Sequence, residues 1–302
     1  MVKASAEYKR LHKPNSGREK IEILYEDAYL AVICKPEGML SVPYPGSRAR
    51  TALDALELVM RRRGTYSAGR RPFAVHRLDR ETSGVMMFAL TERAMRKIMD
   101  TWHQMVAERI YRAVAENPKP PAQPLPDAGL IDDEIAYNAR NIGFVPRPGS
   151  TEFKTVPART HFSVIVRGRR HTLFELSLDT GRKNQIRAHL AGRGCPLAGD
   201  ENYRAQTDPF GRLALHARTL EFDHPFTGER LKFERPEPAE WREAVENAPR
   251  QAEQTDALSR RTSGGGGHPN AAAAPRRSGG KKRRRAPTDH TGRGMPSDWN
   301  SR

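Results

Sequence analysis

The chain has 302 residues, of which 37% are hydrophobic and 29% charged, and its mean hydropathy is −0.75. This composition can fill one large core or two small ones and leaves a polar remainder. No run approaches the roughly 18 apolar residues that a membrane helix needs, and residues 1–20 lack the apolar centre of a signal peptide. We therefore expect a cytoplasmic protein.

The net charge of +16 is shared between two parts of the chain. Residues 250–302 hold 12 Lys/Arg and 4 Asp/Glu, a net +8, so the preceding 249 residues carry the other +8 (16 − 8). A cationic field of this size favours a polyanionic partner or an anionic membrane surface. A basic tail alone does not account for it.

Cysteine and histidine spacing argues against metal and disulfide chemistry. Cys34 and Cys195 are far apart in the sequence, which indicates two buried, reduced thiols and neither a disulfide framework nor a cysteine-based zinc site. Four histidines lack paired short spacing with carboxylates or thiolates, so we predict no metal. These are His76, His189, His216 and His224.

The first third of the chain predicts alternating strands and helices around one polar loop. Residues 21–27 and 29–36 have the pattern of two strands joined by a tight turn. Residues 51–63 predict an amphipathic helix with Thr51 as its N-cap. The most informative loop, residues 76–84, lies between this helix and a further pair of elements. That pair is a strand at 85–89 and a helix at 91–106.

The following segments contain more strands than helices. The five prolines of residues 117–126 predict an extended surface connection, because proline lacks the amide donor that helices and central strands need. Strands that mostly follow one another favour an α+β fold over a doubly wound sheet. The expected elements are strands at 160–166, 172–178, 213–220 and 230–233 and a short helix at 184–191.

Composition divides the chain into three parts. Beyond residue 249, a glycine run, an alanine run and the basic cluster at 281–285 replace the apolar residues. We expect a polar N-terminal arm at 1–20, one folded domain at 21–249 and a disordered basic tail at 250–302.

The loop AVHRLDRETSGVMMFAL packs charged residues between two apolar flanks, as working loops on rigid scaffolds do. Asp79 lies between Arg77 and Arg80, whose positive charge favours its ionised form. An ionised carboxylate suits a nucleophile. The residues alone nevertheless favour an aspartate that caps a turn or pairs with an arginine.

Five ordered blocks change that balance, because HRLDRETSG at 76–84 resembles the HRLD…TSG signature of the RluA family of pseudouridine synthases. Ordered co-occurrence over residues 21–238 is more specific than any single motif. The other blocks that resemble the family are RIYRA at 109–113, TGRKNQIRAHL at 180–190, GCPLAGDENY at 194–203, and LHA at 215–217 with HP at 224–225.

The resemblance implies an RNA pseudouridine synthase on the pseudouridine synthase fold, an α+β architecture with a mixed, largely antiparallel central sheet and flanking helices. It implies no cofactor. Asp79 matches the family's essential aspartate. Tyr111 matches an aromatic that stacks on the target base and takes part in proton transfer at C5, with a core tyrosine as the alternative. Arg187 matches the arginine that pairs with the aspartate, with an RNA phosphate as its alternative partner.

The resemblance also implies substrate contacts from both motif loops. Arg77 is expected to fill the place that the target uridine leaves in its stack, because a planar guanidinium can stack and donate hydrogen bonds. The remaining substrate-binding candidates are His76, Thr82, Arg182 and Gln185.

The sequence departs from the family pattern at two neighbouring positions. Asn184 stands where the family usually has histidine, and Lys183 where it has threonine or serine. Asparagine can donate a hydrogen bond but cannot carry a proton near neutral pH, so a proton relay at this position is in doubt. We expect this departure to leave the assignments of Asp79, Tyr111 and Arg187 unchanged. Asp200 either orients a strand end or contacts the site, and we favour the structural role.

We therefore predict a uridine isomerase that acts on a stem-loop of ribosomal RNA or tRNA, as a monomer without a membrane partner. The short arm before residue 21 resembles the family branch that has the catalytic domain without an S4 RNA-binding domain. The tail is either a sequence-blind contact for RNA or an inert extension. Two alternatives stay open: a non-catalytic RNA-binding or RNA-folding protein on the same scaffold, and a retaining glycosidase, for which no second carboxylate stands out.

Overall fold

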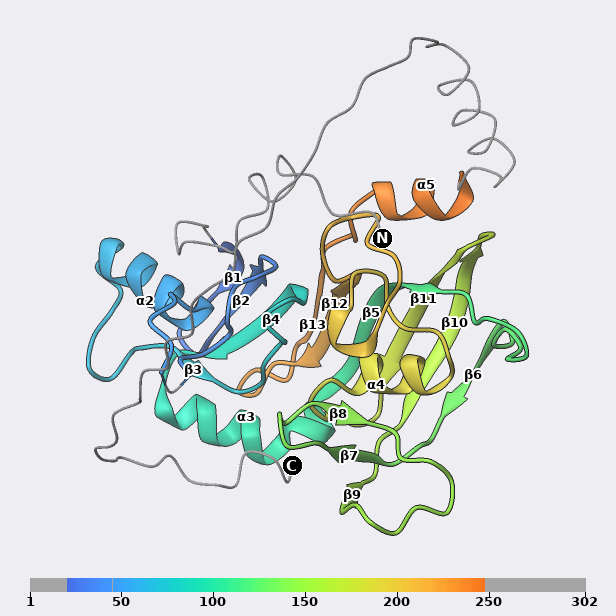
Figure 1. Ribbon diagram of the computed structural model, residues 1–302. Coiled ribbons are helices and arrows are strands. Elements are labelled where there is room, and N and C mark those ends of the chain that lie inside the picture. Colours follow the sequence, from blue (N-terminus) through green and yellow to red (C-terminus); the bar gives the residue numbers. More distant parts are fainter. Residues whose placement is uncertain (1–20, 45, 248–302) are drawn as a thin grey trace, which may run out of the picture. The chain divides into compact units, whose positions relative to one another are not determined.

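The computed structural model describes residues 21–44 and 46–247 (Figure 1). By its contacts the chain divides at residue 248, and every described residue belongs to the first unit. The predicted arm at 1–20 and the predicted tail at 250–302 lie outside the described residues. The domain limits of 21–249 stay a prediction.

A central sheet of ten strands organises the described part of the chain (Figure 1). Eight strands lie in the order β1, β2, β4, β12, β5, β11, β10 and β6, while β3 pairs with β4 and β13 with β12. Their bounds are β1 Glu22–Glu26, β2 Leu30–Lys35, β3 Phe73–Ala74, β4 Ser83–Ala89, β5 Val106–Glu116, β6 Ala128–Ile131, β10 Thr160–Arg167, β11 His171–Leu178, β12 Leu215–Asp223 and β13 Arg230–Glu234.

The strand pairs of this sheet are antiparallel except for β4 with β12, which run parallel with Ser83 opposite His216. A second, antiparallel sheet has the order β8 (Gly143–Phe144), β7 (Ile135–Tyr137), β9 (Thr155–Val156). The predicted α+β class with a mixed, largely antiparallel central sheet is confirmed.

The helices begin where the sequence places capping residues. Helix α2 (Ala52–Arg62) has the capping box of Thr51 and Asp54, and α3 (Glu92–Met105) is capped by Thr91. Helix α4 (Gln185–Gly192) follows Asn184, whose side chain makes no capping hydrogen bond. The C-terminal elements are the 3₁₀ turn η1 (Glu201–Tyr203) and α5 (Glu240–Glu246), neither of which is among the predicted elements.

Strand β4 is buried along its whole length because helices cover both of its faces. Its side chains alternate: Met86 and Phe88 join the core under α2, while Val85 and Met87 join the core under α3. The loop that contains Asp79 runs directly into this strand, so the chemistry expected of the loop rests on a fully buried element of the sheet.

The structure departs from the predicted elements where strands are short or directly follow a helix. The helix predicted through residue 106 ends at Met105, and β5 begins at once with Val106. Four short strands between residues 128 and 156 are also absent from the predicted elements. Two to four residues carry too little alternation to be recognised.

Candidate active site

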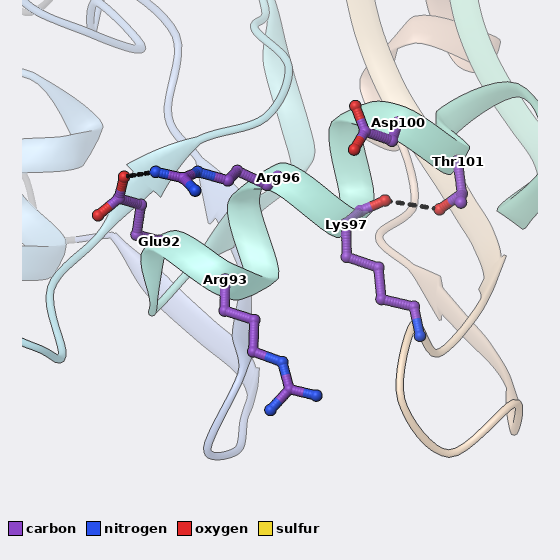
Figure 2. Close-up of a pocket in the computed structure, with 6 residues that line it drawn as sticks. All are labelled: Glu92, Arg93, Arg96, Lys97, Asp100 and Thr101. Carbon is purple, nitrogen blue, oxygen red and sulfur yellow. Dashed lines mark hydrogen bonds and ion pairs between the residues drawn. The ribbon is translucent and has the colours of Figure 1, made fainter.

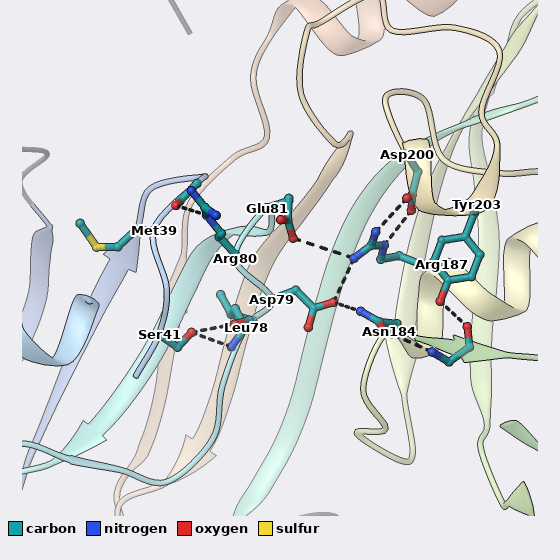
Figure 3. Close-up of polar contacts among 12 residues, drawn as sticks. Met39, Ser41, Leu78, Asp79, Arg80, Glu81, Asn184, Arg187, Asp200 and Tyr203 are labelled. Atoms are coloured by element: carbon teal, nitrogen blue, oxygen red, sulfur yellow. Dashed lines mark hydrogen bonds and ion pairs between the residues drawn. The ribbon is translucent and has the colours of Figure 1, made fainter. Parts of the chain in front are cut away.

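Two hydrogen bonds between Ser41 and the Leu78 backbone hold the loop before β4 in place (Figure 3). The Ser41 hydroxyl donates to the Leu78 carbonyl oxygen at 2.7 Å and accepts from the Leu78 amide at 3.1 Å, and both residues are buried. On the other side of Asp79, the Thr82 amide donates to the Asp79 carbonyl oxygen at 3.1 Å and closes a turn. Asp79 is therefore fixed at its backbone on both sides.

Lys35, at the end of β2, holds the same loop from the side. Its fully buried ammonium donates to the carbonyl oxygens of Pro36, Met39 and Arg80, at 2.9, 2.8 and 3.2 Å. Burial lowers the pKa of Lys35 to about 7, against the opposing charges of nearby carboxylates. Because Arg80 follows Asp79, this lysine anchors the chain next to the candidate nucleophile.

The Asp79 carboxylate meets two donors from the start of α4 on a single oxygen (Figure 3). The Asn184 amide donates to Oδ2 at 2.7 Å, and Arg187 Nη1 lies 3.6 Å from the same atom. The Asp79 side chain is 18% exposed. The structure places Arg187 near Asp79, and the shorter of the two contacts belongs to Asn184.

The main partner of Arg187 is Asp200 instead. Arg187 donates two hydrogen bonds to Asp200, at 2.7 and 2.8 Å, and the two side chains are 5% and 1% exposed. Burial by itself lowers the pKa of the Arg187 guanidinium, but the Asp200 hydrogen bonds and the Asp79 charge raise it well above its usual value. The arginine is a permanent cation shared by both aspartates. Asp200 therefore reaches the site through Arg187, the alternative that the sequence leaves open beside a structural role.

Tyr111 lies on β5 opposite Leu176 of β11 and Ala217 of β12. Its half-buried ring packs against two separate hydrophobic clusters of the core. Burial raises the pKa of its hydroxyl, and the Asp79 charge adds to that rise. Tyr111 is therefore a neutral phenol near Asp79.

Two of the five substrate-binding candidates are available to solvent. Arg77 is exposed. The pKa of Lys183 is lowered mainly by the burial of Lys183 itself and next by the positive charge of Arg77. Arg182 is half-buried and donates through Nε to the Pro157 carbonyl oxygen at 3.0 Å. Arg77 thus keeps the freedom that an inserted side chain requires.

The other three candidates make contacts within the protein or are buried, and their role in substrate binding stays a prediction. Gln185 is 3% exposed, and its amide group makes four hydrogen bonds to residues 159–182. His76 accepts from the Met87 amide at 2.8 Å, and burial lowers its pKa to about 3, so it is a neutral acceptor that braces β4. Thr82 is 2% exposed. All three shape the motif loops from within.

A separate pocket of about 500 Å³ lies on the outer face of α3 (Figure 2). None of the site residues predicted from the sequence lines it. Its polar groups are partly used by the helix itself, since Arg96 pairs with Glu92 and Thr101 donates to the Lys97 carbonyl oxygen. The cluster around Asp79 remains the candidate active site.

Within the described ranges 21–44 and 46–247, no group of three or more His, Cys, Asp or Glu side chains is placed to hold a metal. Cys34 and Cys195 are free thiols. No helix of the described part is long and apolar enough to cross a membrane.

Comparison with known proteins places these features in a family. The family model "RNA pseudouridylate synthase" matches residues 29–192. An uncharacterized RNA pseudouridine synthase, YlyB, of Bacillus subtilis is 36% identical over 75% of this chain and 72% of its own length. Ribosomal large subunit pseudouridine synthase D of Neisseria meningitidis is 35% identical over 72% of this chain, which spans 58% of that relative.

Two solved structures share the fold. The human RNA pseudouridylate synthase domain containing 4 superposes with a TM-score of 0.58 at 24% identity, covering 74% of this chain and 91% of that one. The human RNA pseudouridylate synthase domain containing 1 superposes with a TM-score of 0.57 at 22% identity, covering 82% of this chain and 97% of that one. These two structures show the fold, while the family model and the sequence relatives establish that this chain belongs to the RNA pseudouridine synthases of the RluA type.

Proposed function

We propose that the chain isomerises specific uridines of ribosomal RNA to pseudouridine, with Asp79 as the nucleophile. The observation that carries this proposal is the geometry of Asp79: a partly exposed carboxylate on a rigid loop, held by Asn184 and by the permanently charged Arg187. Every version of the reaction requires a positioned carboxylate, and the two donors on Oδ2 supply that positioning.

The reaction breaks the bond between uracil N1 and ribose C1′ and forms a bond between C5 and C1′. The C5 hydrogen is lost and N1 gains one, so the product is an isomer and no oxidant or cofactor is consumed. The carboxylate attacks the sugar, attacks the base, or first removes a proton from the sugar. We leave these three routes open, because each needs the same ionised, positioned oxygen.

In this proposal the neighbouring residues have separate tasks. Tyr111 stacks on the base and takes part in the proton transfer at C5; as a neutral phenol it has a proton to exchange. Arg187 orients Asp79. Arg77 fills the place that the flipped uridine leaves, which its exposure permits.

The choice of ribosomal RNA rests on the names of the relatives in Neisseria meningitidis and Pseudomonas aeruginosa, which are ribosomal large subunit synthases. The net +8 of the first 249 residues suits any folded RNA, so tRNA is the second candidate substrate. We further propose that the chain works in the cytoplasm as a monomer, that residues 21–249 are the catalytic domain, and that the tail adds non-specific affinity.

Mapping pseudouridines tests the proposal in cells. RNA is compared from cells with the gene, without it, and without it but carrying the Asp79→Asn variant at matched protein level. We expect at least one large-subunit rRNA position to lose its pseudouridine in the second and third strains. Loss of a pseudouridine from a tRNA instead identifies tRNA as the substrate. Identical maps, or restoration by the variant, contradict the proposal and favour a non-catalytic RNA-binding protein.

A further inference from the structure

Asn184 occupies an unusual place for a residue that begins a helix. An asparagine at an N-cap ordinarily uses its side-chain oxygen to accept from the helix's own amides. Here the side chain makes no such bond, and the backbone is left-handed, with φ 58° and ψ 20°. The buried amide is directed away from α4 instead. It donates to Asp79 Oδ2 at 2.7 Å (Figure 3).

The other end of the Asn184 amide is fixed as well. Its oxygen accepts from the Gly143 amide at 3.4 Å, and the Gly143 carbonyl accepts from the Tyr203 hydroxyl. A side chain at Gly143 would come within 2.9 Å of the Lys183 carbonyl oxygen, so the backbones of β8 and of the loop before α4 are in close contact. The amide can therefore present only its NH₂ group to Asp79.

We propose that Asn184 is a positioning residue that fixes Oδ2 of Asp79 and thereby leaves Oδ1 as the reacting oxygen. This inference rests on the proposed function. Arg187 Nη1 also approaches Oδ2, at 3.6 Å, and within the described residues no hydrogen bond or ion pair reaches Oδ1. A carboxylate held through one oxygen keeps its second oxygen unshielded and aimed in one direction.

The asparagine performs this task without a charge of its own. A histidine at the same place would titrate near neutral pH, whereas an amide donates at every pH at which Asp79 is ionised. The surrounding groups already supply charge of both signs. They are Lys183 and Arg187 beside Asn184, Arg77 and Glu81 beside Asp79, and Lys35 on β2. The phenols Tyr137 on β7 and Tyr203 on η1 also lie near Asp79, and they are neutral because burial raises the pKa of both.

Asn184→Gly is the first test, because glycine tolerates the left-handed backbone and removes only the amide. We measure tritium release from an unmodified large-subunit rRNA transcript labelled with [5-³H]uridine, under single-turnover conditions. We expect the rate constant to fall about 10- to 100-fold, the loss of one hydrogen bond to a charged group. The Kd for the RNA should stay within about twofold.

The matched control is Asn141→Gly. Asn141 is also left-handed, with φ 56°, but lies exposed in the turn between β7 and β8. Its rate constant should equal that of the wild type, which separates the lost amide from the added glycine.

Asn184→Asp keeps the shape and the acceptor for Gly143 but replaces the donor by a second carboxylate. At pH 7.5 we expect a decrease in rate of about 100-fold or more, because two like charges then face each other. Two carboxylates in contact share a proton as the pH falls, and the shared proton restores a donor to Asp79. The ratio of variant to wild-type rate should therefore rise about tenfold between about pH 7.5 and 5.5.

A residue that merely supports the fold leaves that ratio independent of pH. A flat ratio, or an Asn184→Gly variant with wild-type rate, overturns the inference even if the wild type is active. Wild-type protein that releases no tritium from either the rRNA transcript or a tRNA transcript overturns the proposed function itself.

Discussion

On one side of the candidate site, Arg187 and Asp200 form a bidentate ion pair whose side chains are 5% and 1% exposed. On the other side, the Asp79 carboxylate is 18% exposed and is held through one oxygen. Asp200 and Asp79 are thus both paired with Arg187. They differ in burial, and burial decides which one is free to react.

The difference predicts two kinds of mutational effect. A charge removed from the buried side leaves its partner desolvated and unpaired, so the free energy of unfolding falls. A change at Asp79 alters a group that water still reaches, so the fold is nearly unaffected and the chemistry is abolished. Substitutions in the buried pair should therefore lower stability, whereas a substitution of Asp79 should abolish turnover and leave stability nearly unchanged.

Arg187→Met breaks the buried side most directly. Asp200 then keeps a charge at 1% exposure without its partner, and we expect the free energy of unfolding to fall by about 3–5 kcal/mol. Urea denaturation measures the change. The double variant Arg187→Met with Asp200→Leu should recover most of the stability. If the single variant is as stable as the wild type, the buried pair is not an anchor.

Lys35→Met tests the anchor below the loop. The change leaves the carbonyl oxygens of Pro36, Met39 and Arg80 without their common donor, and we expect the free energy of unfolding to fall by about 1–3 kcal/mol. Part of this loss is offset because the variant no longer buries an amine. Lys232→Met, at a half-exposed position on β13, is the control and should change stability by less than about 0.5 kcal/mol. Equal stabilities of the two variants contradict the anchoring role.

His76 predicts a smaller effect that depends on pH. Its folded pKa of about 3 lies below the ordinary value of 6.5, so the unfolded chain binds more protons as the pH falls below 6.5. The unfolding free energy therefore decreases from pH 6.5 downward, by up to about 1.4 kcal/mol per pH unit for this group.

Denaturation at about pH 7.5, 6.0 and 5.0 measures that slope. In His76→Gln, which keeps an acceptor for the Met87 amide, the slope should be flatter by about that amount. The exposed His103→Gln is the control and should leave it unchanged. Equal slopes in all three proteins contradict a neutral His76 that accepts from the Met87 amide.

Deleting residues 250–302 should have the smallest effect on stability, within about 0.5 kcal/mol. The deletion removes 12 of the 52 Lys/Arg, so RNA affinity should fall most at low salt. The slope of log K against log salt should flatten by about 0.7–0.9 for each phosphate that the tail neutralises. An unchanged slope shows that the tail does not bind the RNA.

The sequence predicts those parts of the fold that depend on local signals. Caps at Thr51 and Thr91 and the apolar run of β4 are sufficient to locate their elements. The start of β5 directly after α3 is not predictable in this way, because β5 is stabilised by its distant partners β11 and β12. The strands of the small sheet are too short to show an alternating pattern.

The candidate site divides in the same way. The motif blocks point to Asp79, Tyr111 and Arg187, and the structure brings Asp79 and Arg187 within 3.6 Å. The contact of Asn184 with Asp79 joins residues 105 positions apart, and the Arg187–Asp200 pair joins a helix to a turn. Contacts of this kind follow from tertiary packing, which a motif does not describe.

Asp79→Asn tests the central claim most directly. Tritium release from labelled, unmodified large-subunit rRNA is measured together with the Kd for that RNA and the free energy of unfolding. We predict no detectable turnover, a Kd within about threefold of the wild type, and a change in stability below about 1 kcal/mol. Turnover equal to the wild type would contradict the assignment of Asp79 as the nucleophile.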